Sequence, residues 1–268
     1  MRQADDFLEE SKTILALLAS RDDSCFDTVT QFKGWTINDV IQHLHYFNIL
    51  AAYSILDETE LARSLEEIRL RRAEGQSLRD IADHDLDGLH GQALLRSWQV
   101  TYSELAALYK SLDPKTRLKW AGPDMSALSS LSARLMETWA HGQEIYDVLG
   151  AARVDHDRIR NIVVLGVNTY GWTYQVRQEQ PHGPMPFIRL IAPSGDEWTF
   201  GDDDGENLIE GRATEFCQVV TQTRNVKDTA LRVTGPIAED WMSKAQCFAG
   251  GRNDPPEPGT RFRSPVTA

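Results

Sequence analysis

Glu137 and His141 are the two residues whose types and spacing most suggest chemistry. They lie four residues apart in a segment that reads RLMETWAHG from Arg134 to Gly142. Side chains at this spacing share one face of a helix, and a carboxylate beside an imidazole is a donor pair for a divalent metal. A solvated pair on a helix surface has the same spacing, so spacing alone leaves both interpretations open.

A third metal ligand has to come from another segment, and the closest grouping of histidines is His43 and His45. Two positions on a helix differ by ~200° in direction, so only one of these imidazoles faces a given site. His43 lies nearer the centre of the buried stripe and is the candidate ligand. The alternative is a histidine at the edge of the buried stripe that hydrogen bonds to a neighbouring helix. The stripe consists of Ile37, Val40, Leu44, Phe47 and Ala51.

The apolar stripe of the helix that carries Glu137 is centred away from this residue, on positions such as Leu135, Trp139 and Ile145. A metal site that includes Glu137 is therefore expected at the edge of the helical core. Such a position is a cleft that a substrate can enter.

Apolar residues at helical spacing predict four long helices in the first 150 residues. Thr36 and Asp39 form a capping-box variant at the start of the second helix, and Gly150 ends the fourth. Between the second and third helices, charges of alternating sign predict an exposed helix plus a connection. The helices are expected at about 5–20, 37–55, 89–112 and 126–149, with the charged segment at 58–85.

The pattern changes after residue 150. A helix over 159–174, two strands around a Pro-Ser-Gly-Asp turn within 187–200, a helix over 214–223 and a strand over 231–234 indicate a mixed unit. The sequence therefore predicts an α+β protein with a helical domain over 1–150 and a smaller α+β domain over 151–249. Residues 250–268 are rich in Pro, Gly and Arg and predict an extended or mobile tail.

Composition excludes several classes of protein. Of 268 residues, 40 are acidic and 28 basic, which gives a net charge of −12 and argues against nucleic acid as a partner. No apolar run reaches the roughly 18 residues of a membrane span, and the acidic N-terminus is unlike a signal peptide. Three widely spaced cysteines (Cys25, Cys217 and Cys247) are interpreted as small buried residues of a cytoplasmic protein.

The segments around His43 and His141 together resemble the DinB-like superfamily, specifically its mycothiol-dependent maleylpyruvate isomerase branch. The matching segments read GWTINDVIQHL from Gly34 and LMETWAHGQEI from Leu135. The resemblance implies a DinB-like four-helix bundle whose His–Glu–His metal triad falls on His43, Glu137 and His141. It also implies that a low-molecular-weight thiol such as mycothiol takes the open metal position. Two imidazoles and one carboxylate accept zinc, nickel or iron, and zinc is the first candidate.

Two reactions are open to such a site: cis–trans isomerisation of an unsaturated keto acid by reversible thiol addition, or transfer of the thiol to an electrophile. Either reaction develops negative charge that needs a cation. Of the available arginines (Arg134, Arg189, Arg212 and Arg224), Arg224 most resembles the late arginine of the family and is the catalytic candidate. The competing hypothesis is a non-enzymatic small-molecule-binding protein with a structural or vacant metal site. The expected partners are the substrate and the thiol, and the protein is expected to be a monomer or homodimer.

Overall fold

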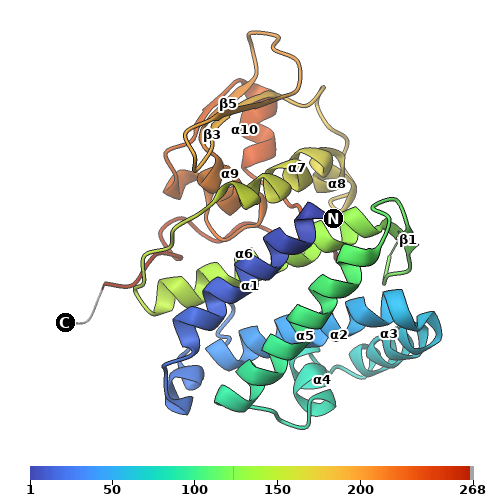
Figure 1. Cartoon of the computed structure of the whole chain (residues 1–268). Coiled ribbons are helices and arrows are strands. Elements are labelled where there is room, and N and C mark those ends of the chain that lie inside the picture. Colours follow the sequence, from blue (N-terminus) through green and yellow to red (C-terminus); the bar gives the residue numbers. More distant parts are fainter. Residues whose placement is uncertain (123, 266–268) are drawn as a thin grey trace. The chain divides into compact units, whose positions relative to one another are not determined.

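Helices make up most of the first of two compact units, Met1–Ile145 and Tyr146–Ala268. The computed structural model describes residues 1–122 and 124–265 of the chain. The fold is α+β, with a helical N-terminal unit and a C-terminal unit that contains a sheet, as the sequence predicts (Figure 1).

The long helices of the first unit surround its core. In Figure 1, α2 and α5 lie side by side, and α1 packs on α5. The helix α6 contacts α5 through a hydrogen bond between the hydroxyls of Tyr109 and Ser130, 2.6 Å apart, and contacts α2 through the rings of His141 and His43. The predicted helices are confirmed with small shifts at their ends: α1 (Arg2–Leu18), α2 (Ile37–Leu56), α5 (Gly91–Ser111) and α6 (Ala127–Val148).

The start of α2 is fixed by a reciprocal capping box. The backbone N–H of Asp39 donates to Thr36 Oγ1 over 3.1 Å, and the backbone N–H of Thr36 donates to Asp39 Oδ2 over 2.8 Å. Two donors that the helix itself leaves unpaired are thereby satisfied. This cap sets the first turn of the helix that carries His43.

Removing the cap is expected to lower stability. The substitution Thr36→Ala deletes the acceptor for the Asp39 N–H and should reduce the free energy of unfolding by about 1 kcal/mol, measured by urea titration. Thr36→Ser keeps the hydroxyl and is the matched control. Equal loss in both variants would show that the methyl group, rather than the hydrogen bond, carries the contribution.

The segment 58–85 departs from the prediction of one helix and a connection. It folds as two helices, α3 (Glu58–Ala73) and α4 (Leu78–Asp85), and a second capping box between Ser77 and Asp80 starts α4. Ile81 and Ala82 of α4 are buried in a cluster with Tyr46 and Leu50 of α2. These two apolar residues anchor the short helix α4 to α2. Two residues are too few to produce a helical periodicity that the sequence could reveal. The unit also contains η1 (Asp23–Asp27), β1 (Arg117–Leu118) and β2 (Met125–Ser126).

The second unit contains a mixed sheet with the strand order β4-β3-β5-β6. The predicted hairpin is confirmed, since β3 and β4 pair antiparallel with Leu190 opposite Trp198. The strand β5 pairs parallel to β3 and antiparallel to β6. The helix α9 packs on β3 and β5, and α10 on β6. The elements are β3 (Phe187–Ile191), β4 (Glu197–Phe200), β5 (Leu208–Arg212), α9 (Ala213–Val220), η3 (Val226–Asp228), β6 (Arg232–Thr234) and α10 (Pro236–Met242).

The predicted helix over 159–174 is interrupted at Thr169. It divides into η2 (Asp157–Ile159), α7 (Arg160–Asn168) and α8 (Tyr170–Gln175). The hydroxyl of Thr169 donates to the carbonyl oxygens of Leu165 and Gly166 at 2.7 and 3.1 Å. Such side-chain bonds to the preceding turn compete with the helical pattern and bend helices.

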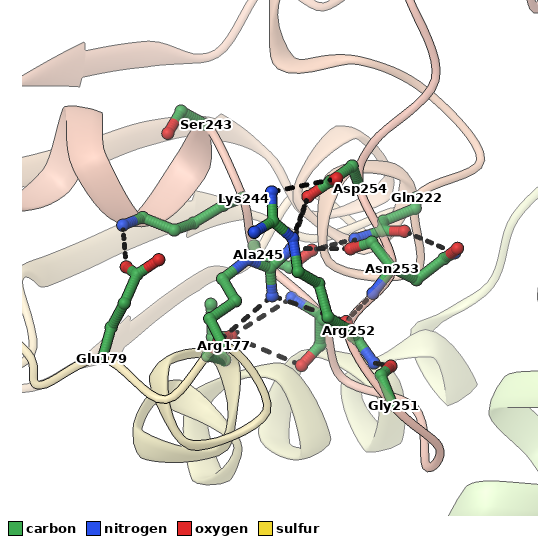
Figure 2. Close-up of polar contacts among 12 residues, drawn as sticks. Arg177, Glu179, Gln222, Ser243, Lys244, Ala245, Gly251, Arg252, Asn253 and Asp254 are labelled. Carbon is green, nitrogen blue, oxygen red and sulfur yellow. Dashed lines mark hydrogen bonds and ion pairs between the residues drawn. The ribbon is translucent and has the colours of Figure 1, made fainter.

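The segment that follows Phe248 is extended and anchored to the body of the second unit. Figure 2 shows Arg177 donating to the carbonyl oxygen of Asn253 over 2.6 Å, while the side chains of Asn253 and Gln222 are 2.9 Å apart. Farther along, the backbone N–H of Ser264 donates to the carbonyl oxygen of Asp147 over 2.8 Å. These contacts hold the described part of residues 250–265 in place without any helix or strand.

Candidate metal centre

His43 of α2 meets Glu137 and His141 of α6. One donor atom from each lies within 4.8 Å of the other two. The Nε2 atoms of both imidazoles lie 3.3 Å from the same carboxylate oxygen, Glu137 Oε2. Two imidazoles and one carboxylate around a common point form a donor set that suits a divalent transition metal.

Aromatic side chains hold the two imidazoles in place. The ring of Trp35 stacks on that of His141 with 5.8 Å between centroids and 4° between planes, and Phe32 meets His141 edge-on. On α2, Phe47 lies one turn after His43, with 4.7 Å between ring centroids. This packing restricts ring rotation and preorganises the donor atoms.

The triad lies at the margin of the core. The side chains of His43, Glu137 and His141 are 17%, 21% and 12% exposed. The triad is therefore partly exposed to solvent, which agrees with the position at the edge of the helical core expected from the apolar stripe.

Burial and hydrogen bonding fix the protonation states of two of the three ligands. Burial lowers the pKa of His43 to about 4, against the opposing effect of its hydrogen bond to Glu137. Burial raises the pKa of Glu137, but hydrogen bonds from His141 and His43 outweigh burial and hold this pKa well below its ordinary value. At neutral pH the site thus offers a neutral imidazole at position 43 and an ionised carboxylate, the forms that bind metals.

His45 points away from the triad. Its Nε2 atom lies 3.0 Å from the hydroxyl of Ser97 on α5, and the residue is 3% exposed. Only His43 of this pair faces α6 at the triad. The separation follows from the ~200° between two such positions on a helix.

A shallow surface depression adjoins His43. The short helix α4, which the sequence prediction treats as part of a connection, forms one wall of it, and α2 forms another. The wall of α4 includes Arg79, whose guanidinium lies 3.6 Å from Asp39. The lining residues are Trp35, Asp39, Gln42, His43, Leu78, Arg79 and Ala82.

Arg224, the predicted catalytic cation, lies in the second unit just after α9. Its Nη2 atom donates to Asp147 Oδ1 over 2.7 Å, and its Nη1 atom lies 2.7 Å from Asp147 Oδ2. The side chain is 10% exposed. Its guanidinium is thus bound by a carboxylate of its own unit, and its catalytic role stays a prediction.

Sequence reasoning missed the residues that support the triad. Trp35 and Phe47 act through the orientation of the imidazoles and carry no metal-binding signal of their own. The spacing of Phe47, four residues after His43, was available but served only to define the apolar stripe.

Within the described part of the chain, no helix is long and apolar enough to cross a membrane.

Comparisons with known proteins agree with this architecture. Residues 7–146 match the family of the mycothiol maleylpyruvate isomerase N-terminal domain. Two uncharacterised proteins of Mycobacterium tuberculosis, from different strains, are each 34% identical over 245 residues, which cover 91% of this chain and 94% of theirs.

Two solved structures have the same fold. The crystal structure of the mycothiol-dependent maleylpyruvate isomerase aligns with a TM-score of 0.56 at 16% identity, covering 88% of this chain and 95% of that one. A histidine-to-alanine mutant of that isomerase aligns with a TM-score of 0.52 at 15% identity, covering 81% and 87%. At such identities the likeness concerns the fold.

Proposed function

Because this chain belongs to the mycothiol maleylpyruvate isomerase N-terminal domain family, we propose that it is a metal-dependent enzyme that uses a low-molecular-weight thiol such as mycothiol. Its reaction is the isomerisation of an unsaturated keto acid or the transfer of the thiol to an electrophile. The observation that carries the proposal is the meeting of His43, Glu137 and His141 from two helices. An ionised carboxylate shared by two imidazoles fits a divalent cation, with zinc as the first candidate and nickel or iron as alternatives.

Three protein ligands are typical of catalytic rather than structural zinc sites, because a fourth position remains for an exogenous ligand. A bound metal there would favour the thiolate form of a thiol, which is its nucleophilic form. The protein's own part is to hold Glu137 ionised and to orient the imidazoles through Trp35 and Phe47. The triad is partly exposed, as a site that receives a ligand from solvent requires.

The protein's cysteines do not supply this thiol. Cys217 and Cys247 are buried in the second unit, whereas Cys25 is partly exposed, which corrects the interpretation of all three as buried. Burial raises the pKa of the Cys25 thiol and raises that of Cys217 well above its ordinary value, so both are poor nucleophiles at neutral pH. The proposed thiol therefore comes from outside the protein, and three free cysteines suit the reducing cytoplasm.

The proposal is tested by adding thiols to the zinc-loaded protein and measuring heat stability. Mycothiol, glutathione and bacillithiol are compared, each with metal-free protein and the His141→Ala variant as controls. We expect one thiol to raise the melting temperature of the zinc-loaded wild type alone, since a ligand that binds only the folded protein stabilises it. That thiol should then support isomerisation of maleylpyruvate or conjugation to an electrophile.

The competing hypothesis of a non-enzymatic binding protein makes a different prediction. The triad would hold a structural zinc ion or no metal at all, and no thiol would change the melting temperature of the protein. This outcome, or a failure of the wild type to bind any divalent metal, would contradict the proposed function.

A further inference from the structure

Arg134 carries a buried guanidinium without an acidic partner. It lies on α6, three residues before Glu137, and is 6% exposed. Its Nη1 atom is buried and has no hydrogen-bond partner. Among the described residues, the side chain of Arg134 forms neither an ion pair nor a hydrogen bond, and its guanidinium carbon lies 5.8 Å from the centroid of the Phe47 ring.

This environment is unfavourable for an arginine with only a structural role. A buried cation is strongly destabilising unless a carboxylate and hydrogen bonds compensate for lost hydration. Arg224 in the second unit shows the ordinary solution, with Asp147 on both of its terminal nitrogens. Arg134 has the negative charge of Glu137 nearby, outside ion-pair distance, and its donors remain available.

The position of Arg134 relates it to the triad. On α6, Arg134, Glu137 and His141 are spaced so that they share one face. On α2, Phe47 contacts both the His43 ring and the guanidinium of Arg134. The Phe47 ring centroid lies 5.8 Å from the guanidinium carbon and 4.7 Å from the centroid of the His43 ring, so the guanidinium and the triad border the same side chain.

We propose that Arg134 binds a carboxylate of the substrate while the reacting part of the substrate lies at the triad. The inference rests on the proposed function and names its ligand class: a small carboxylic acid whose carboxylate is a few bonds away from the reacting carbon. A guanidinium binds a carboxylate through two parallel hydrogen bonds. The same cation is placed to stabilise negative charge that develops on a conjugated acid during thiol addition.

The test is calorimetric titration of maleate into zinc-loaded and metal-free protein. In Arg134→Met, which keeps a long side chain and removes the charge, maleate should bind about 10- to 100-fold more weakly in both forms, as expected for the loss of charge-assisted hydrogen bonds. Zinc should bind as tightly as in the wild type or more tightly, because a nearby cation is gone. The melting temperature of ligand-free Arg134→Met should equal or exceed that of the wild type, since no partner is left unpaired.

Two further variants make the result decisive. Arg69 is an exposed arginine of α3 paired with Glu66, and Arg69→Met removes the same charge without affecting maleate binding. Arg134→Lys keeps the charge but loses the planar guanidinium with its two parallel donors. The Arg134→Lys protein should therefore bind maleate several-fold more weakly than the wild type. This comparison remains informative if Arg134→Met does not fold. Unchanged maleate affinity in Arg134→Lys and Arg134→Met, or no maleate binding to the wild type, would overturn the inference.

The measurements separate this inference from the proposed function. Wild-type protein that binds no zinc contradicts the proposed function, while the comparison in metal-free protein still tests Arg134. Zinc binding and thiol stabilisation that persist alongside unchanged maleate affinity in the Arg134 variants contradict only the role of Arg134.

Discussion

The variant Glu137→Gln is expected to bind zinc at least about 100-fold more weakly than the wild type. Loss of a residue that merely orients a metal ligand costs 10- to 100-fold in metal affinity, and a direct ligand should cost no less. Glutamine retains the size of the side chain but removes the only negative charge of the donor set. Both imidazoles also lose the anionic oxygen that lies 3.3 Å from each of them.

Competition with a chromophoric chelator measures this change directly, and heat stability gives a second readout. Zinc at 100 times the dissociation constant should stabilise the wild type by about 2.7 kcal/mol, and Glu137→Gln should lose most of this gain. His45→Gln is the matched control, because His45 lies on α2, the helix that carries His43, but faces Ser97 instead of the triad. Wild-type zinc affinity in Glu137→Gln, or an equal loss in His45→Gln, would show that zinc binds elsewhere.

The position of His43 follows from sequence because a helix has fixed geometry. The buried stripe of α2 and the ~200° between His43 and His45 determine which imidazole faces α6. The spacing of Glu137 and His141 supplies the other two donors. No sequence pattern pairs α2 with α6, however, so the third ligand needed the family resemblance as well as the helical pattern.

The parts of the fold that the sequence did not predict depend on contacts between distant residues. The strand β5 is preceded by an acidic loop and contains Gly211, with a φ of +149° that L side chains rarely adopt. The strand β5 forms despite this composition because it pairs with β3 and β6. The helix α10 has only seven residues, begins at Pro236 and buries Trp241 and Met242, so packing rather than periodicity specifies it.

Arg134 shows a similar limit. From sequence it is one of four arginines available to an anion, and nothing in the residue types ranks it above the others. Arg134 differs from Arg224 in lacking a carboxylate partner, a difference that is visible only in the folded chain. Arg224 faces Asp147, whereas Arg134 faces Phe47. Burial without compensation is therefore the property that points to a ligand.

The variant Asp147→Asn is expected to destabilise the protein by about 3–5 kcal/mol, the cost of leaving a buried charge without its partner. Asp147 is 1% exposed at its side chain and Arg224 is 10% exposed, with both contacts at 2.7 Å. The double variant Asp147→Leu, Arg224→Met replaces the pair with apolar side chains and should recover most of the loss. Urea titration of the single and double variants forms the cycle that measures the coupling. A loss below about 1 kcal/mol in Asp147→Asn would mean that the pair contributes no more than an exposed one.

The same double variant tests the predicted catalytic role of Arg224 independently of its effect on folding. If Arg224 stabilises developing charge in the reaction, a folded double variant should lose turnover while still binding zinc and the thiol, because the deficit is confined to the transition state. If the ion pair with Asp147 is the only role of Arg224, turnover should fall in the destabilised single variant and recover in the stable double variant. Full turnover in a stable double variant would therefore exclude Arg224 as the catalytic cation and leave Arg134, on the same helix as Glu137 and His141, as the cation that the reaction requires.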